Sequence, residues 1–243
     1  MTIIENITEC PKIEFSSSMR VELVEMAGSD QGICRAARVS TLGAASYGTD
    51  ESAGLIKFLL SNRHGSPFEH GMFTFRISAP IMVWREFMRH RIGFSYNEES
   101  GRYKKLDPKF YVPGLSRPLV QVGKTGAYSF VQGTEEQYEE TLSDLGIAYC
   151  TAWQSYSSML DRGIAKEIAR SCLPVATYST AYVTCNPRSL MSFISLRTRD
   201  ESSKFPSFPQ YEIELVARQM EDIFADEYPL TYAAFNAAGR VSP

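Results

Sequence analysis

The sequence predicts a protein of the α+β class, with a mixed β-sheet and long helices in a single domain. The clearest strand is Met72 to Ala79, in which Phe73, Phe75 and Ile77 alternate with polar side chains, as in a half-buried strand. The clearest helix covers residues 134–163, where apolar side chains recur every three or four positions. Strands and helices follow one another without regular βαβ alternation, which favours α+β over a doubly wound parallel sheet.

The N-terminal half is predicted to begin with a polar extension over residues 1–19. Residues 21–26 alternate apolar and acidic side chains and predict a strand. Ser29 or Asp30 is a suitable N-cap for the helix that follows. A loop over residues 43–50 and a short helix over residues 55–60 come next. Pro80 suits the first turn of a helix that leads toward Arg89.

The C-terminal half is predicted to open with a long, partly mobile loop over residues 104–133, which is rich in proline and glycine. Thr134 and Gln137 form a capping-box pattern at the start of the long helix, and Gly163 is its expected end. The remaining predictions are a short helix, a strand, a helix, a loop and a final helix, at residues 165–171, 177–184, 187–197, 200–209 and 213–224. The predicted domain spans residues 20–236.

The composition is that of a globular protein with no general affinity for nucleic acid polymers. Of the 243 residues 44% are hydrophobic, and the formal net charge is −3, whereas a general nucleic-acid binder is strongly basic. Against this mildly acidic background, seven arginine, lysine and histidine side chains gather within residues 85–105. Such a local cluster favours a compact anionic ligand over a long polyanion.

The five cysteines are odd in number, scattered and without a CxxC pair. This spacing indicates neither a zinc site nor a disulfide framework, so five buried thiols are expected. The histidines His64, His70 and His90 lack an HExxH context, and no metal is predicted. With no signal peptide and no apolar run near eighteen residues, we expect a cytoplasmic protein that does not enter a membrane.

Residues 89–103 carry the strongest functional signal, Arg-His-Arg-Ile-Gly-Phe-Ser-Tyr-Asn-Glu-Glu-Ser-Gly-Arg-Tyr. Arginines at the end of an apolar segment suit a phosphate, which matches the guanidinium fork. The alternative is a solvated helix end whose cations complement the dipole. Because no GxGxxG or Walker sequence is present, side chains would have to hold the phosphate. The residues alone thus indicate an anion- or nucleotide-binding protein with no assigned chemistry.

Four blocks of the sequence, in order, resemble those of the flavin-dependent thymidylate synthases. The first is His-Gly-Ser-Pro-Phe-Glu-His at residues 64–70, and the second is Arg-His-Arg with the Ser-Gly-Arg-Tyr that follows, at residues 89–103. Glu-Ile-Ala-Arg-Ser-Cys-Leu-Pro at residues 167–174 and Asn-Pro-Arg-Ser-Leu-Met-Ser-Phe-Ile-Ser-Leu-Arg at residues 186–197 complete the set. The resemblance extends from about residue 20 to about residue 235.

This resemblance implies reductive methylation of dUMP to dTMP. Methylenetetrahydrofolate gives the carbon, NADPH reduces bound FAD, and the reduced flavin gives the hydride. The family is homotetrameric, with FAD and dUMP held by residues from different chains. It needs no cysteine nucleophile, and none of the five cysteines follows a proline, as the nucleophile of the unrelated folate-only synthases does.

Carried over by position, the resemblance also implies the site residues. Arg197 is the implied catalytic residue, which favours ionisation of uracil N3 by electrostatic stabilisation. The implied cofactor contacts are His64, Ser66, Arg89, His90, Arg91, Glu98, Asn186, Arg188 and Ser192. The implied dUMP contacts are Glu86, Phe87, Met88, Arg89, Glu98, Glu99, Ser100, Gly101, Arg102, Arg170 and Arg197.

The chain departs from the family pattern at three places. Eight residues separate Arg91 from Ser100 where the family has seven, and Gly93 is expected to absorb the extra one as a bulge. Glu86 stands where some members have glutamine. Residues 198–209 are longer than usual, and a histidine near the flavin of some members has no counterpart. Two alternatives stay open: a nucleotide-binding flavoprotein without methyl transfer, and a non-enzymatic nucleotide- or RNA-binding module.

Overall fold

The computed structural model describes residues 13–124 and 127–243. The chain divides into two compact units, neither of them continuous in sequence. The sheet unit comprises Met19–Ala79, Val83–Glu98 and Thr180–Pro243. The α4 unit comprises residues 13–18, Pro80–Met82 and Glu99–Ser179. Mixed helices and strands confirm the predicted α+β class, whereas the predicted single domain stays a prediction.

The sheet unit is built on a four-stranded sheet in the order β2-β3-β8-β4. Its strands are β2 (Arg20–Ala27), β3 (Met72–Pro80), β4 (Phe94–Glu98) and β8 (Tyr178–Cys185). β2 and β3 are antiparallel, with a register shift between Leu23 and Glu25. β4 and β8 are also antiparallel and in unbroken register, from Phe94 opposite Cys185 to Glu98 opposite Ala181.

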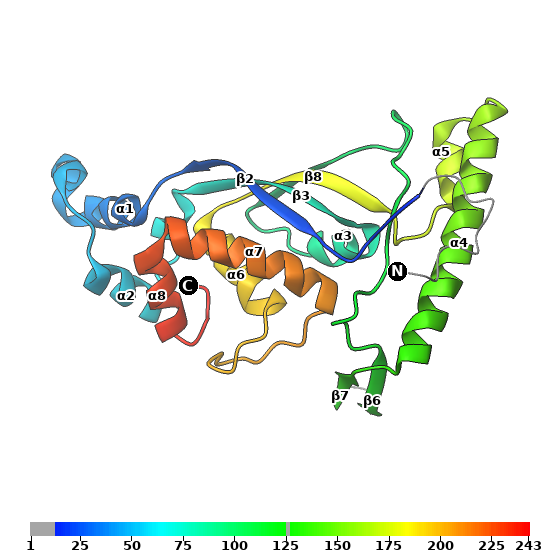
Figure 1. Ribbon diagram of the computed structural model, residues 1–243. Coiled ribbons are helices and arrows are strands. Elements are labelled where there is room, and N and C mark those ends of the chain that lie inside the picture. The colour runs from blue at the N-terminus through cyan, green and yellow to red at the C-terminus, as the bar shows by residue number, and fades with distance from the viewer. Residues whose placement is uncertain (1–12, 125–126) are drawn as a thin grey trace. The chain divides into compact units, whose positions relative to one another are not determined.

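Two helices, α6 (Pro187–Arg197) and α7 (Tyr211–Glu227), run along one face of this sheet (Figure 1). The predicted alternation in β3 explains this packing, because Phe73, Phe75 and Ile77 are fully buried. Phe73 meets Phe224 of α7 edge to face, with 6.1 Å between ring centroids. Burying an aromatic side chain of this size contributes roughly 1.5–3 kcal/mol.

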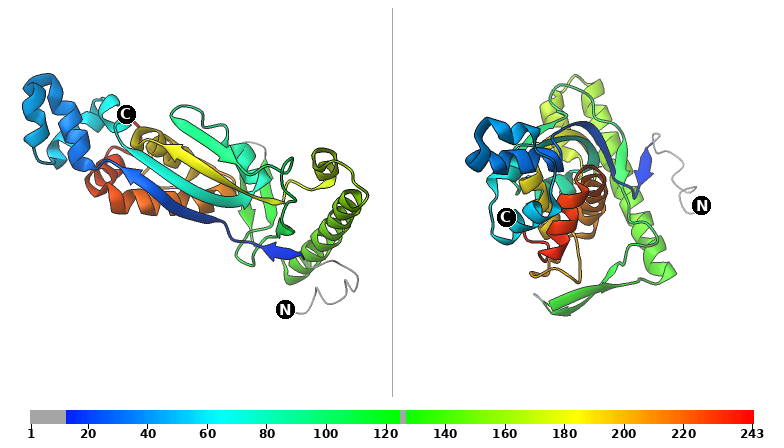
Figure 2. Two further views of the ribbon diagram at one scale, coloured as in Figure 1. Left: turned by 90° about the horizontal axis from the view of Figure 1, so that it is seen from above. Right: turned by 90° about the vertical axis from the view of Figure 1, so that its left-hand side faces the viewer.

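Helices α1 (Asp30–Leu42), α2 (Ala53–Ser61) and α8 (Pro229–Ala237) gather beyond one end of the sheet (Figure 2). The predicted cap is confirmed, because the Ser29 side chain accepts a hydrogen bond from the Gly32 amide. Asp30 caps a different helix: its buried carboxylate accepts hydrogen bonds from the amides of Leu230 (2.8 Å) and Thr231 (3.0 Å) at the start of α8. Two short 3₁₀ turns, η2 (Gly43–Gly48) and η3 (Ser66–Glu69), and helix α3 (Ile81–Phe87) complete the elements that precede β4.

The α4 unit is organised by α4 (Glu135–Asp161), the longest helix, with α5 (Lys166–Ala169) and η4 (Arg170–Cys172) beside it (Figure 1). Its capping box is formed as predicted, with Thr134 and Gln137 each bonded to the other's backbone amide. The core of this unit is formed by four buried aromatic side chains, those of Phe110, Tyr149, Trp153 and Tyr156. Strands β1 (Glu14–Ser16) and β5 (Lys109–Tyr111) pair in parallel, and β6 (Val120–Lys124) pairs with β7 (Ala127–Val131) as an antiparallel ribbon.

The prediction of a loop over residues 104–133 was wrong, and the elements β1 and α8 were not predicted. The loop predicted over residues 104–133 contains β5 and the β6–β7 ribbon, because β-prone side chains alternate between its glycines. The extension predicted over residues 1–19 includes β1, although residues 1–12 lie outside the described residues. Helix α8 was not predicted. Among the described residues, every helix is either too short or too polar to span a bilayer.

The prediction of five buried thiols holds for only part of the set. Cys34 and Cys185 are buried free thiols, whereas Cys172 is only partly buried. Cys150 is disulfide-bonded. The odd number and the spacing of the cysteines did not indicate this bond, because folding can bring together cysteines that are distant in the chain. Cys10 lies outside the described residues.

Candidate functional site

The start of α6 presents polar side chains to a cavity of about 440 Å³ in the sheet unit. Asn186 is the N-cap of α6, and its Oδ1 accepts a hydrogen bond of 2.8 Å from the Ser189 amide. This bond leaves the Asn186 NH₂ group free to donate. Asn186, Arg188 and Ser192, three of the implied cofactor contacts, line this cavity, together with Arg63, Glu69, Ile92, Gly93, Ser189, Ser242 and Pro243.

Arg188 joins the start of α6 to the turn that carries His64 and Ser66. Its guanidinium donates to Glu69 at 2.5 Å and to the Pro243 carbonyl at 2.7 Å. A β-carbon on Gly65 would lie 2.5 Å from Arg188 Cζ, so a larger residue there would push the guanidinium from this position. The structure thus brings two of the four sequence blocks together. The sequence did not single out Gly65, although a glycine between two polar candidates was a signal for such a close approach.

The extra residue after Arg91 lies in the turn before β4. Gly93 has a φ of +68°, and a β-carbon there would lie 2.1 Å from Ser189 Oγ. Because β4 pairs with β8 in unbroken register from Phe94 onward, the insertion does not disturb the strand. Gly93 thus lies in a turn that lines the cavity and not in a bulge within the strand, and its expected role for the extra residue stays a prediction.

At the other end of α6, two hydrogen bonds and an ion pair hold the guanidinium of Arg197. Nε donates to His90 Nε2 at 2.9 Å, and one terminal nitrogen lies 3.0 Å from the Glu86 carboxylate. The other terminal nitrogen donates to the Glu86 carbonyl at 3.3 Å. The Arg197 side chain is 15% exposed. An arginine has five N–H donors, so two remain for a ligand.

His90, an implied cofactor contact, faces Arg197 within an aromatic enclosure. Its ring meets Phe193 of α6 edge to face at 4.8 Å and lies 6.1 Å from the ring of Phe94. Burial, with smaller contributions from Arg197 and Arg89, lowers the pKa of His90 from 6.5 to about 4. The imidazole is therefore neutral near pH 7, as it must be to accept a hydrogen bond at Nε2.

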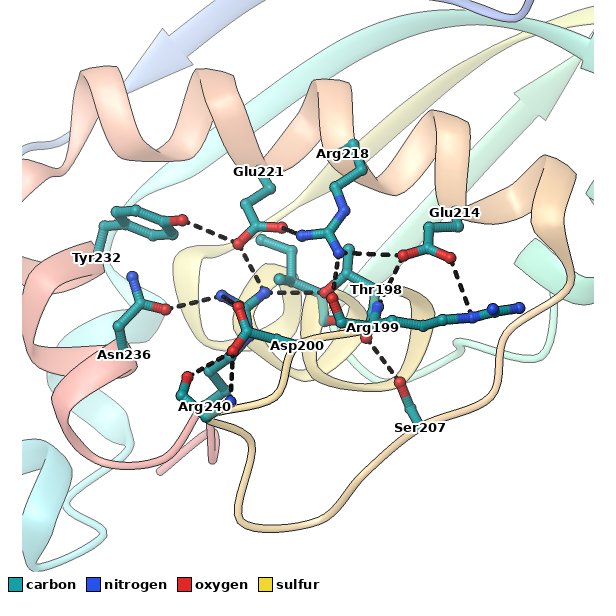
Figure 3. A network of polar contacts seen from close by, with 12 residues as sticks. Thr198, Arg199, Asp200, Ser207, Glu214, Arg218, Glu221, Tyr232, Asn236 and Arg240 are labelled. Carbon is teal, nitrogen blue, oxygen red and sulfur yellow. Dashed lines mark hydrogen bonds and ion pairs between the residues drawn. The ribbon is translucent and has the colours of Figure 1, made fainter. Parts of the chain in front are cut away.

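A polar network holds the chain that follows Arg197 (Figure 3). Arg240, whose side chain is 1% exposed, bonds to Glu221 at 2.6 Å and to Thr198 Oγ1 at 2.8 Å. The Thr198 hydroxyl in turn donates to the Ile194 carbonyl of α6 at 2.8 Å. Arg218 donates to the Arg199 carbonyl. These contacts fix the residues that directly follow Arg197 to α7 and to Arg240.

The α4 unit contains a second group of implied residues, built on the turn that begins at Ser100. The Ser100 hydroxyl accepts a hydrogen bond of 3.3 Å from the Arg102 amide. Gly101 is buried, and a β-carbon on it would lie 3.2 Å from Arg170 Cδ. Arg102 pairs with Glu167 at 3.1 Å, one helical turn before Arg170. Gly101 and Arg102 thus lie beside residues 167–170, which are about 70 positions away in the sequence.

The remaining implied residues take different positions. Arg89 and Arg91 are exposed, and neither guanidinium has an ion-pair partner within the described ranges. Met88 is 39% exposed, whereas Phe87 is fully buried against Phe193. Phe87 is therefore part of the core in this chain. Glu98 ends β4, and Glu99 pairs with Lys104 at 2.9 Å.

Comparisons with known proteins agree with one another. The model of the Thy1 family, described as thymidylate synthase complementing protein, matches residues 22–230. A flavin-dependent thymidylate synthase of Streptomyces coelicolor is 54% identical over 238 residues, which is 96% of this chain and 97% of the relative. One from Tropheryma whipplei is 53% identical over 233 residues, 94% of this chain and 97% of the relative.

A solved structure is also similar. The crystal structure of PolB from Streptomyces cacaoi, a UMP/dUMP methylase bound with 5-Br UMP, superimposes with a TM-score of 0.89 at 48% sequence identity. The match covers 96% of this chain and 100% of that chain.

Proposed function

Because the chain belongs to the Thy1 family, and within it to the flavin-dependent thymidylate synthases, we propose that it converts dUMP to dTMP with methylenetetrahydrofolate as carbon donor and NADPH as reductant. The chain is an enzyme, a methyltransferase that works with a flavin. The flavin is FAD in this proposal, and the assembly is a homotetramer in the cytoplasm. Residues 20–236 form its domain, and residues 1–19 its extension.

The cavity at the start of α6 suits part of an FAD molecule. Its volume of about 440 Å³ lies within the range of small-molecule sites. It offers the amide donors of Asn186 and the cation of Arg188, and Gly93 lies in its lining without a β-carbon that would displace the Ser189 hydroxyl. The proposed flavin contacts are His64, Ser66, Arg89, His90, Arg91, Glu98, Asn186, Arg188 and Ser192.

The length of α6 favours a dinucleotide over a smaller flavin. Arg188 and Arg197 are nine residues apart, which is roughly 13 Å along a helix at 1.5 Å per residue. A ligand that reaches from the cavity toward Arg197 must therefore be extended. The reduced flavin, when bound, supplies the hydride that completes the methyl group.

The chain's own residues act on dUMP by electrostatics and orientation. The partly free guanidinium of Arg197 would stabilise negative charge at uracil N3, which makes C5 more nucleophilic. Ser100, Arg102 and Arg170 would hold the phosphate, because guanidinium groups and a hydroxyl donate to its oxygens. The other proposed dUMP contacts are Glu86, Met88, Arg89, Glu98, Glu99 and Gly101.

The cysteines support a mechanism without a thiolate nucleophile. Burial raises the pKa of Cys34 and of Cys185, so both thiols stay protonated near neutral pH. A thiol must ionise to attack carbon.

The observation that carries the proposed function is the partly free guanidinium of Arg197, which Glu86 and His90 hold in a chain of this family.

A flavin spectrum and a turnover assay test the proposal. The purified protein, reconstituted with FAD, should be yellow, and NADPH with dUMP should bleach it under anaerobic conditions. With methylenetetrahydrofolate present, tritium should leave C5-labelled dUMP. A protein that binds no FAD contradicts the proposal. A protein that binds FAD and dUMP but releases no tritium is a flavoprotein without methyl transfer.

A further inference from the structure

We propose that His90 is a positioning residue for Arg197, whose guanidinium it fixes through a neutral hydrogen-bond acceptor. The inference rests on the proposed function and deepens it, since it gives His90 a task that contact with a cofactor does not include. It is carried by the 2.9 Å bond from Arg197 Nε to His90 Nε2 and by the packing of the imidazole against Phe193.

The geometry fixes the guanidinium at two separate points. His90 accepts from Nε, near the base of the fork, while the Glu86 carbonyl accepts from one terminal nitrogen and the Glu86 carboxylate forms an ion pair with the other. With Nε and both terminal nitrogens bound, the plane of the fork cannot rotate without breaking a bond. A guanidinium held in advance needs no reorganisation when charge develops on the substrate.

The neutrality of His90 is as important as its position. Glu86 already places one carboxylate on Arg197. With a second carboxylate in place of His90, Arg197 and its two partners would carry a net negative charge, where the substrate must itself gain negative charge. An imidazole acceptor adds no charge, so the positive charge of Arg197 is less compensated. A protonated imidazole would have no lone pair to accept with. The aromatic enclosure favours the neutral form, which agrees with the lowered pKa of His90.

The structure also separates this role from direct action on the substrate. Two N–H groups of Arg197 remain free, whereas His90 Nε2 is occupied by Arg197. Through this nitrogen His90 acts only by way of Arg197, and we expect its removal to matter only while Arg197 is present.

A double-mutant cycle tests this dependence in the FAD-loaded protein. His90→Leu removes the acceptor and should lower kcat by roughly 10- to 100-fold, the range expected when preorganised charge stabilisation is weakened. His90→Gln keeps a neutral acceptor and should restore most of the loss. In the Arg197→Lys background, His90→Leu should cause no further loss. His70→Leu, a change at an exposed histidine outside the site, is the matched control and should behave as wild type.

Three results would overturn the proposal. The first is full activity of His90→Leu, and the second is independent, multiplying losses in the double variant. The third is a loss of turnover in His90→Leu that saturating FAD fully restores, because such a loss comes from cofactor affinity alone and not from the position of Arg197.

A measurement without turnover keeps the two proposals separable. In ¹⁵N NMR spectra near pH 7, His90 should carry its proton on Nδ1, and its Nε2 resonance should move in the Arg197→Lys variant. If wild-type protein forms no dTMP, the proposed function fails while this signal still tests the His90–Arg197 bond. An Nε2 resonance that ignores Arg197 overturns the bond, whatever the activity.

Discussion

Arg197 makes two hydrogen bonds and an ion pair with one planar group, and a lysine cannot reproduce that geometry. We expect Arg197→Lys to keep its fold and its flavin but to lose more than tenfold in turnover, about 1.4 kcal/mol or more in activation free energy. Tritium release from C5-labelled dUMP measures the loss. The control Arg76→Lys, in an exposed pair with Glu22, should keep full activity. Near-normal turnover of Arg197→Lys would remove this residue from the mechanism.

Arg102 tests the proposed phosphate site. Its pair with Glu167 is about half-exposed on both sides, so its loss leaves no buried charge without a partner, and stability should change by about 0–1 kcal/mol. We expect Arg102→Ala to weaken dUMP binding by about 1.5–3 kcal/mol, the contribution of a hydrogen bond to a charged group. Calorimetric titration with dUMP measures the change, and urea unfolding checks the stability. An unchanged dissociation constant would place the phosphate elsewhere.

His90 gives the fold a dependence on pH. Burial and two arginines lower its pKa from 6.5 to about 4, so the unfolded chain binds a proton at this residue more readily than the folded chain. Its contribution to stability is therefore complete above pH 6.5 and is lost as pH falls from 6.5 to about 4. Thermal unfolding across this window should show a smaller decrease in Tm for His90→Gln than for wild type. Equal decreases in the two proteins would contradict this.

At the scale of elements, Asp30 connects two helices that are 200 residues apart in sequence. Its buried carboxylate accepts from two amides and a hydroxyl at the start of α8. We expect Asp30→Asn to destabilise the protein by about 1–3 kcal/mol, since a charged acceptor is replaced and a buried donor is left poorly satisfied. Urea unfolding measures the cost, with Asp50→Asn at an exposed position as control. A variant as stable as wild type would show that α8 needs no cap.

The elements that the sequence predicts well are those with a repeated local signal. The β3 alternation and the long apolar stripe of α4 recur over many residues, so tertiary contacts do not override them. The β6–β7 ribbon was missed because glycines interrupt its alternation, and α8 because its cap, Asp30, comes from the other end of the chain.

The candidate site shows the same division. Motif blocks identify Arg197, His90 and Arg170 individually, because each stands in a recognisable local sequence. That Arg197 bonds to His90 across 107 positions, or that Gly101 lies against Arg170, depends on how strands and helices pack. Local sequence carries no distance between such residues, so these pairings were beyond prediction.

At the scale of the whole molecule, the proposed tetramer implies active sites shared between chains. Arg197 lies in the sheet unit and Arg102 in the α4 unit, and we expect one site to take them from different protomers. Mixed tetramers of Arg197→Lys and Arg102→Ala subunits, refolded together, should then recover roughly a quarter of wild-type activity by random assortment. Turnover of the mixture, compared with each variant alone, measures the recovery. Sites contained within one chain would give no gain on mixing.

Helix α6 has a consequence for how the sequence is free to vary. It begins at Asn186, beside the cavity, and ends at Arg197, beside His90, with no interruption between. One inserted residue would rotate everything after it by about 100° and advance it by about 1.5 Å. Such a change would swing the guanidinium away from both of its acceptors while Asn186 stayed in place. The number of residues in α6 is therefore constrained by function, because it sets the distance and the angle between Asn186 and Arg197.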